Sequence, residues 1–176
     1  MHQKLPKEID PFRLAQTGLK LDGELPLATM PRLTKSLQND EGVVNVKMAF
    51  DMDEIGTPYM RGNFTASVSV ICERCMEPMM LELDVDCLLA MVSSERKVEG
   101  LAEQYDPWIL ENNDPVLLSS VVEDELILSL PLVPRHEEVC LPDEAWSAGD
   151  DEVNELIEAD KPASPFAVLE ALKTKH

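Results

Sequence analysis

Three stretches in the first half of the chain alternate between apolar and polar positions. Apolar side chains take every second position in residues 44–52, 64–70 and 81–89. Successive side chains of a β-strand point to opposite faces of the sheet, so this pattern is typical of strands with one buried face. We therefore predict strands over residues 42–52, 58–72 and 79–92, paired in sequence order as an antiparallel meander.

Helix signals flank these strands. Asp10 followed by Pro11 is typical of a helix start, and Gly18 would end that short helix. A second Asp-Pro pair, at Asp114, predicts a longer helix over residues 116–130. Shorter elements are predicted as strands over residues 19–25 and 105–110 and a helix over residues 30–37. Together these elements predict an α+β fold, an antiparallel β-sheet packed by the long helix, with short N- and C-terminal helices.

Three consecutive acidic residues, Glu123, Asp124 and Glu125, lie in the predicted long helix. They point about 100° apart around the helix axis, so they cannot all face water on one side. The apolar residues of this helix lie nearly all the way round, which is typical of a helix buried on several sides. At least one carboxylate should therefore lie near the packed surface and need a partner. We predict that Arg74 is that partner.

Length and composition bound the domain organisation. With 176 residues and 44% hydrophobic composition, the chain can bury one core of ordinary size. We predict a single α+β domain over residues 1–136, followed by an acidic, loosely ordered segment over residues 137–163. Residues 164–176 are expected to form a short helix whose apolar stripe, including Phe166, docks on the domain or on a partner.

The sequence shows no sign of membrane insertion or of secretion. No run approaches the ~20 apolar residues that a membrane helix needs, and the N-terminus has no apolar stretch resembling a signal. We expect a cytoplasmic protein without a membrane partner. Because cytosolic thiols stay reduced, the four cysteines do not indicate a disulfide scaffold.

The formal net charge is −19, from 15 basic and 34 acidic residues. A chain this acidic should as a whole repel nucleic acid, because binding to phosphates is driven by Lys and Arg. The acids concentrate in residues 137–160, which hold no Lys or Arg. This distribution favours a basic protein as partner over bare RNA, and a purely solubilising role for the charge stays open.

The most specific local chemistry is the Cys-x-x-Cys turn of Cys72 and Cys75, between two of the predicted strands. Tetrahedral zinc sites commonly combine such a turn with two further ligands. The candidates for that second pair are His136 and Cys140. Cys87 falls on the apolar face of its strand, where a buried cysteine is ordinary core filler.

Two alternatives to zinc stay open. A catalytic dithiol typically begins at a helix N-terminus, which lowers the pKa of the first cysteine, whereas this pair lies between strands. The simplest interpretation is two reduced thiols in a turn, with Arg74 as a structural residue between them. The sequence therefore leaves the cofactor open between none and zinc.

Signatures of catalysis are few. Only seven glycines occur and they do not cluster, so the chain lacks a glycine loop that could cradle phosphates. His136 is the sole plausible general base, and no Ser or Cys nucleophile has a recognisable setting beside it. We expect a protein that is not an enzyme.

Four stretches of the chain resemble the YceD family, the large ribosomal RNA subunit accumulation proteins of bacteria. They are residues 10–13, the turn at residues 72–75, residues 121–134 and residues 165–173, in the order expected for the family. The most distinctive feature is the Glu-Asp-Glu-Leu-Ile-Leu run in the third stretch, which is followed by Pro131 and Pro134. Together they span nearly the whole chain.

The resemblance implies a role in making, processing or stabilising 23S ribosomal RNA while the large subunit assembles. Family genes often neighbour one for a small basic large-subunit ribosomal protein, and an acidic chain suits such a partner or an assembly intermediate. Contact with rRNA would then be indirect. The family brings no established catalytic residues. Some members carry more cysteines where this chain has only His136 and Cys140.

Two further versions of this function stay open. One is a direct RNA-binding module that uses basic residues near the N-terminus, Arg13, Arg32 and Lys35, together with Arg74. Its affinity should fall steeply with salt. The other is a zinc-dependent version of the assembly factor.

Overall fold

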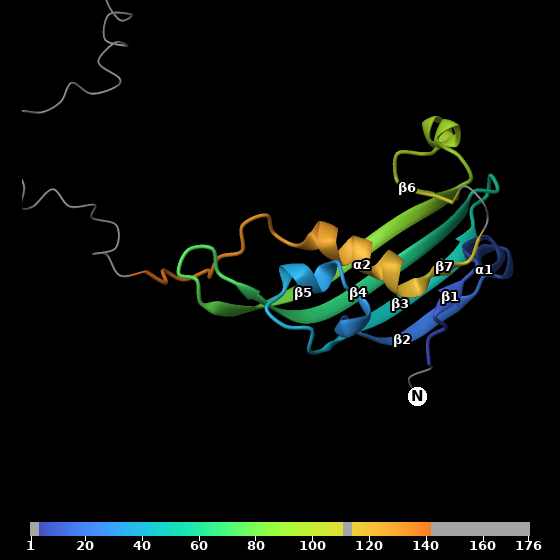
Figure 1. The fold of residues 1–176 in the computed structure, drawn as a ribbon. Helices are drawn as coiled ribbons and strands as arrows, with labels where there is room; N and C mark the ends of the chain where they lie inside the picture. Colours follow the sequence, from blue (N-terminus) through green and yellow to red (C-terminus); the bar gives the residue numbers. More distant parts are fainter. Residues whose placement is uncertain (1–3, 111–113, 142–176) are drawn as a thin grey trace, which may run out of the picture. The chain divides into compact units, whose positions relative to one another are not determined.

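The computed structural model describes residues 4–110 and 114–141 (Figure 1). Its centre is a five-stranded sheet in the order β2-β3-β4-β5-β6. The first four of these strands form an antiparallel meander, and β6 pairs in parallel with β5. The predicted α+β fold is confirmed. The strands are Lys20–Pro26 (β2), Val43–Met52 (β3), Pro58–Ile71 (β4), Pro78–Val92 (β5) and Asp106–Ile109 (β6).

Among the described residues, two α-helices lie outside this sheet. The first, α1 (Pro11–Thr17), begins as predicted, because Oδ1 of Asp10 accepts a hydrogen bond of 3.1 Å from the backbone N–H of Arg13. It ends at Gly18, whose φ of 63° is left-handed. The second, α2 (Leu118–Ser129), follows the sheet in the chain.

The structure corrects two of the predicted helices. The predicted helix 30–37 is replaced by two separate 3-10 turns, η1 (Leu27–Thr29) and η2 (Leu33–Ser36). The predicted helix 116–130 begins only at Leu118, because the two residues before it form β7 (Val116–Leu117) and pair with β1 (Glu8–Ile9). A third 3-10 turn, η3 (Glu95–Gly100), lies within the predicted loop at 93–105.

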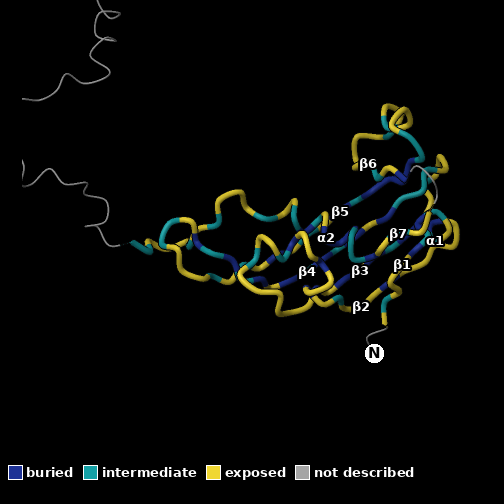
Figure 2. The backbone as a smooth tube through the Cα atoms, in the orientation of Figure 1, coloured by how far each residue is buried: buried dark blue, intermediate teal, exposed yellow. Residues whose placement is uncertain are grey.

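One face of the sheet carries the core. Figure 1 shows α2 and the two 3-10 turns η1 and η2 on the same side of the strands. Phe64 of β4 and Leu126 of α2 are fully buried between these layers, and buried and exposed positions alternate along the strands (Figure 2). Buried positions of α2 extend over more than half of its circumference, which confirms the predicted burial on several sides, while Leu128 is 80% exposed on the remaining side.

The opposite face of the sheet is polar. Its side chains include Asn63 of β4, whose amide donates hydrogen bonds of 3.0 Å to both Asp84 and Asp86 of β5. Ser67 makes a similar bond to Glu82. Within residues 4–110 and 114–141, no helix has the length and apolar character needed to cross a bilayer. The C-terminal helix predicted at 164–176, with Phe166, and nearly all of the acidic segment 137–163 lie outside the described residues.

Candidate metal centre

The connection between β4 and β5 is a tight turn that presents two cysteines. The backbone N–H of Cys72 donates to the carbonyl of Glu77 at 2.9 Å, and the N–H of Met76 donates to the carbonyl of Cys72 at 2.8 Å. Met76 has a φ of 62°, a left-handed conformation that side chains other than Gly, Asn and Asp adopt at a cost. This conformation reverses the chain directly after Cys75.

The segment that follows α2 runs against this turn. The backbone N–H of Glu73 donates to the carbonyl of Pro134 at 2.9 Å. The guanidinium of Arg74 donates to the carbonyl of His136 at 3.0 Å and also to the carbonyl of Glu138. Arg74 therefore holds the segment after α2 against the hairpin, through its backbone.

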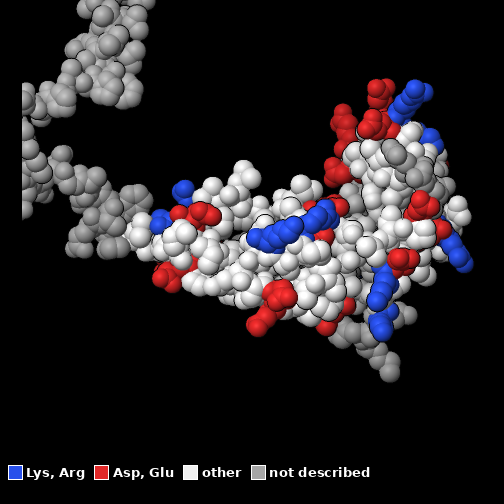
Figure 3. All heavy atoms as spheres, viewed as in Figure 1, with Lys and Arg blue, Asp and Glu red and all other residues white. Residues whose placement is uncertain are grey.

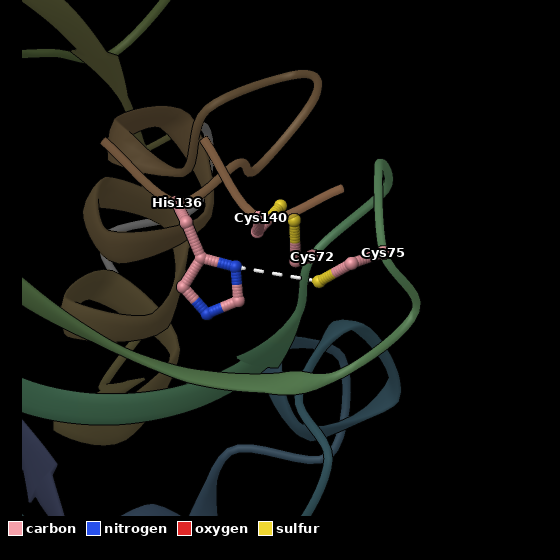
Figure 4. Close-up of side chains that lie close together, drawn as sticks. All are labelled: Cys72, Cys75, His136 and Cys140. Carbon is pink, nitrogen blue, oxygen red and sulfur yellow. Dashed lines mark hydrogen bonds between the residues drawn. The ribbon is translucent and has the colours of Figure 1, made fainter. Parts of the chain in front are cut away.

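These contacts bring the four predicted metal-ligating residues together (Figure 4). The ligand atoms of Cys72, Cys75, His136 and Cys140 all lie within 4.8 Å of one another, and Sγ of Cys75 is 3.4 Å from Nδ1 of His136. Zn–S bonds of about 2.3 Å and Zn–N bonds of about 2.0 Å in a tetrahedron place neighbouring ligand atoms about 3.5–3.8 Å apart. Shortening the longest of these separations by about 1.0–1.3 Å would therefore bring the ligand atoms to the spacing of a tetrahedral site.

The surroundings of Cys72 favour the form of sulfur that binds metals. Its side chain is fully buried. Burial raises the pKa of this thiol, but hydrogen bonds from the backbone of Cys75, His136 and Arg74 outweigh burial and lower the pKa to about 5. Because the thiolate is the metal ligand, this set of backbone donors fits a metal-binding cysteine.

Cys87 is excluded from the cluster, as predicted. It lies 8% exposed in the core, facing Gly62 on the neighbouring strand. Burial raises the pKa of its thiol to about 12. A Cβ atom at Gly62 would lie 2.7 Å from this sulfur, which explains a glycine in the middle of β4.

The three acidic residues of α2 occupy different environments. Glu123 is 3% exposed, and its carboxylate accepts hydrogen bonds from the backbone N–H groups of Arg32 at 2.5 Å and Leu33 at 3.0 Å. It also accepts a bond of 3.0 Å from Nε of Arg32. The expectation of a buried carboxylate that needs a partner is confirmed, but that partner is Arg32, where the sequence predicted Arg74.

The other two acids are less enclosed. Asp124 is 57% exposed and lies 2.6 Å from Nη1 of Arg32. Glu125 is half-buried, and burial raises the pKa of its carboxyl, together with the negative charges of Asp106 and Asp124. No simple sequence signal pointed to Arg32, which lies 91 residues from Glu123 in a segment predicted to be a helix.

The remaining predicted residues lie apart from the metal cluster. Arg13 is exposed on α1, and Lys35 lies on η2. Phe166 lies outside the described residues.

Comparison with known proteins gives a family for this arrangement. The model of the family described as "Large ribosomal RNA subunit accumulation protein YceD" matches residues 60–173. The chain belongs to the YceD family. It is 33% identical to the large ribosomal RNA subunit accumulation protein YceD of Haemophilus influenzae over 176 residues, which cover 98% of each chain. No solved structure matches it significantly.

The family match places the candidate metal centre within the YceD region. All four ligand residues and Glu123 lie between residues 60 and 173. Arg32 lies before that stretch, yet the alignment with the Haemophilus influenzae relative extends over almost the whole chain. The resemblance seen in the sequence is thus confirmed.

Proposed function

We propose that this protein is a non-enzymatic factor that supports the synthesis, processing or stability of 23S rRNA while the large ribosomal subunit assembles in the cytoplasm. The observation that carries the proposal is membership of the YceD family, together with the near full-length match to a large ribosomal RNA subunit accumulation protein. The partner would be a basic large-subunit protein or an assembly intermediate that contains one, because the chain has a net charge of −19.

The charge pattern of the described part supports a protein partner over direct RNA contact. The open face of the sheet carries the acidic row of Glu82, Asp84 and Asp86 on β5, beside Lys47 of β3 and Arg61 of β4. Phosphates approaching this face would meet those carboxylates. Arg32, one of the residues of the RNA-binding alternative, already bonds to Glu123 and Asp124 of α2. Contact with rRNA would then be made by the partner.

The placement of His136 supports a role other than catalysis. It is the histidine that the sequence offers as a general base, and its Nδ1 lies 3.4 Å from the sulfur of Cys75. A ring nitrogen in this position suits a metal ligand better than a base aimed at a substrate. The proposed function therefore rests on binding.

Zinc is the proposed occupant of the Cys72, Cys75, His136 and Cys140 cluster. Three thiols and one imidazole are a donor set that zinc prefers in closed structural sites. Bound there, zinc would join the β4–β5 turn to the segment after α2. Titration of the metal-free protein with cobalt(II) tests this directly, because thiolate ligands give an intense near-ultraviolet charge-transfer band. A spectrum without that band would contradict the assignment.

Deletion of the gene tests the function. We expect the ratio of 23S to 16S rRNA to fall, and expression of the wild-type chain from a plasmid to restore it. An unchanged ratio with normal subunit profiles would contradict the proposal. Binding of the purified protein to 23S fragments, with an affinity that falls steeply as salt is raised, would favour the RNA-binding alternative.

A further inference from the structure

A groove with a mixed polar and apolar lining lies on the α2 side of the sheet, next to the candidate metal centre. It has a volume of about 510 Å³ and lies between the end of β4, η2 and the residues that follow α2. We call it the α2 groove. Its apolar lining residues are Leu37, Val70, Ile71, Ile127, Leu130, Pro131, Leu132 and Pro134.

The α2 groove continues onto exposed aliphatic side chains. Leu132 lines the groove and is fully exposed, at 101% of its reference area. Leu128, one turn earlier, is 80% exposed, and Val133 is 47% exposed. Apolar side chains gathered around a groove are typical of a surface that another molecule covers. Figure 3 views this side and shows uncharged surface between the charged side chains at the hairpin end and a patch of Lys and Arg side chains near the middle of the face.

Charges of both signs border the groove, since Glu73 and Lys35 line it and Arg135 follows Pro134 directly, whereas the chain beyond His136 is acidic. Glu73 lines the groove, and its backbone N–H binds the carbonyl of Pro134 on the opposite wall. The chain then continues into Glu137 and Glu138, the first two of ten acidic residues between positions 137 and 160. Lys35 is the single cation among the lining residues. An incoming cationic segment would therefore meet carboxylates as soon as it left the groove.

We infer that the α2 groove binds a Lys- or Arg-rich segment of a basic protein, which inserts an apolar side chain beside Leu132. The apolar contact would supply the buried centre of the interface, and pairing with Glu73, Glu137 and Glu138 would supply its polar rim. A second copy of this chain would bring like charges together, and RNA would bring phosphates to the same carboxylates. The inference rests on the proposed function and names its docking surface.

The groove shares its walls with the metal centre. Glu73 follows Cys72 directly, and Pro134 lies two residues before His136. A metal ion that fixes the positions of Cys72 and His136 would therefore also fix the two walls. Chelation of the metal is expected to weaken binding at the α2 groove at least threefold.

The binding test uses the full-length protein, immobilised and loaded with zinc. The probe is the protein mixture stripped from purified large ribosomal subunits with concentrated lithium chloride. We expect the wild type to retain a basic protein, identified by mass spectrometry and then purified for a titration. Leu132→Asp should weaken its affinity at least tenfold. The matched control is Ile55→Asp, another highly exposed aliphatic position, on the β3–β4 turn, which should bind as the wild type does.

A second pair of variants tests the charged rim. Neutralising Glu73, Glu137 and Glu138 to Gln should weaken binding severalfold. Removing the same number of charges from the open sheet face, by Glu82→Gln, Asp84→Asn and Asp86→Asn, should leave binding unchanged. Equal retention by the wild type and Leu132→Asp, retention of no basic protein, or a Leu132-dependent dimer in sedimentation would each overturn the inference.

Complementation of the deletion strain separates this inference from the proposed function. If the wild type restores the ratio of 23S to 16S rRNA and Leu132→Asp restores it equally well, the docking surface is wrong and the function stands. If deletion leaves the ratio unchanged, the proposed function is wrong. The binding measurement still tests, independently, whether the α2 groove binds a basic protein. We expect the wild type and Ile55→Asp to restore the ratio and Leu132→Asp not to.

Discussion

Two of the connections between the later part of the chain and the earlier part use different chemistry. In the first, Glu123 of α2 is buried and accepts hydrogen bonds from Arg32 and from the backbone N–H of Leu33. In the second, the β4–β5 turn meets the segment after α2 around the cluster that includes Cys72 and His136. The first connection is completed by protein groups alone, whereas the second gathers donor atoms suited to a metal ion.

This difference has a consequence for stability and for regulation. A buried carboxylate satisfied by protein donors does not depend on a metal ion. A cluster of thiols and an imidazole gains much of its strength from its metal and loses that strength when the metal is removed. We therefore expect the anchor at Glu123 to hold the core equally well with and without metal. Loss of metal from the cluster should destabilise only the β4–β5 turn and the segment after α2, where the α2 groove lies.

The largest effect is expected from Glu123→Ala. It leaves the N–H groups of Arg32 and Leu33 without their acceptor and removes a buried partner from the guanidinium, so stability should fall by about 3 kcal/mol. Urea denaturation measures this, and the loss should be the same with zinc and with a chelator. Asp124→Ala, at an exposed ion pair, should cost about 0.5 kcal/mol or less. Equal losses of stability in the two variants would contradict the claim that the buried Glu123 contributes more than the exposed Asp124.

Metal removal should give the second largest effect. With free zinc 100-fold above the dissociation constant, binding to the folded state adds about 2.7 kcal/mol to the free energy of unfolding. A chelator should abolish this increment in the wild type, and Cys75→Ser should lack it from the start. Cys87→Ala keeps the cluster intact, so its zinc-dependent increment should match that of the wild type. An increment that survives in Cys75→Ser would place the metal elsewhere.

Met76→Gly should stabilise the protein at the β4–β5 turn, by a smaller amount. Glycine adopts the left-handed φ of 62° without the steric cost that methionine carries, so the variant should be more stable by about 0.5–1 kcal/mol. Thermal unfolding in the presence of zinc measures the gain. Met80→Gly, in the extended backbone of β5, should instead destabilise the protein. A loss of stability in both variants would show that Met76 makes contacts that outweigh its backbone conformation.

The smallest effect concerns the pH dependence contributed by Glu125. Its pKa in the folded protein is raised from the usual 4.5, so its contribution to stability is fully present below pH 4.5 and is lost as the pH rises through the folded pKa. Glu125→Gln should therefore be more stable than the wild type at pH 7 and equal to it at pH 4. Glu95→Gln, in the exposed η3 turn, is the matched control. A variant with the pH profile of the wild type would contradict the assignment.

The sheet and the metal cluster could be predicted from the sequence because their signals are local or chemically specific. Alternation located both ends of β3, β4 and β5 to within one residue. Cys72 and Cys75 lie in one turn, and thiols and imidazoles are few enough in this chain for His136 and Cys140 to stand out as the second pair.

The features that could not be predicted depend on tertiary contacts. Val116 and Leu117 join a small sheet with residues 8–9, and this pairing delays the start of α2. The segment 30–37 forms a 3-10 turn in which Glu123, far along the chain, takes up two backbone N–H groups. Arg74 was an equally plausible cation for that carboxylate by type. Only the fold shows that Arg74 instead binds the carbonyls of His136 and Glu138.

The most direct test of the metal centre is the zinc content of the full-length protein, purified without a histidine tag and without chelator. We expect about one zinc ion per chain in the wild type and about none in Cys72→Ser, since a Cys3His site holds a single ion. A content below about 0.2 zinc per wild-type chain, after growth with ample zinc, would contradict a resident zinc ion in this cluster.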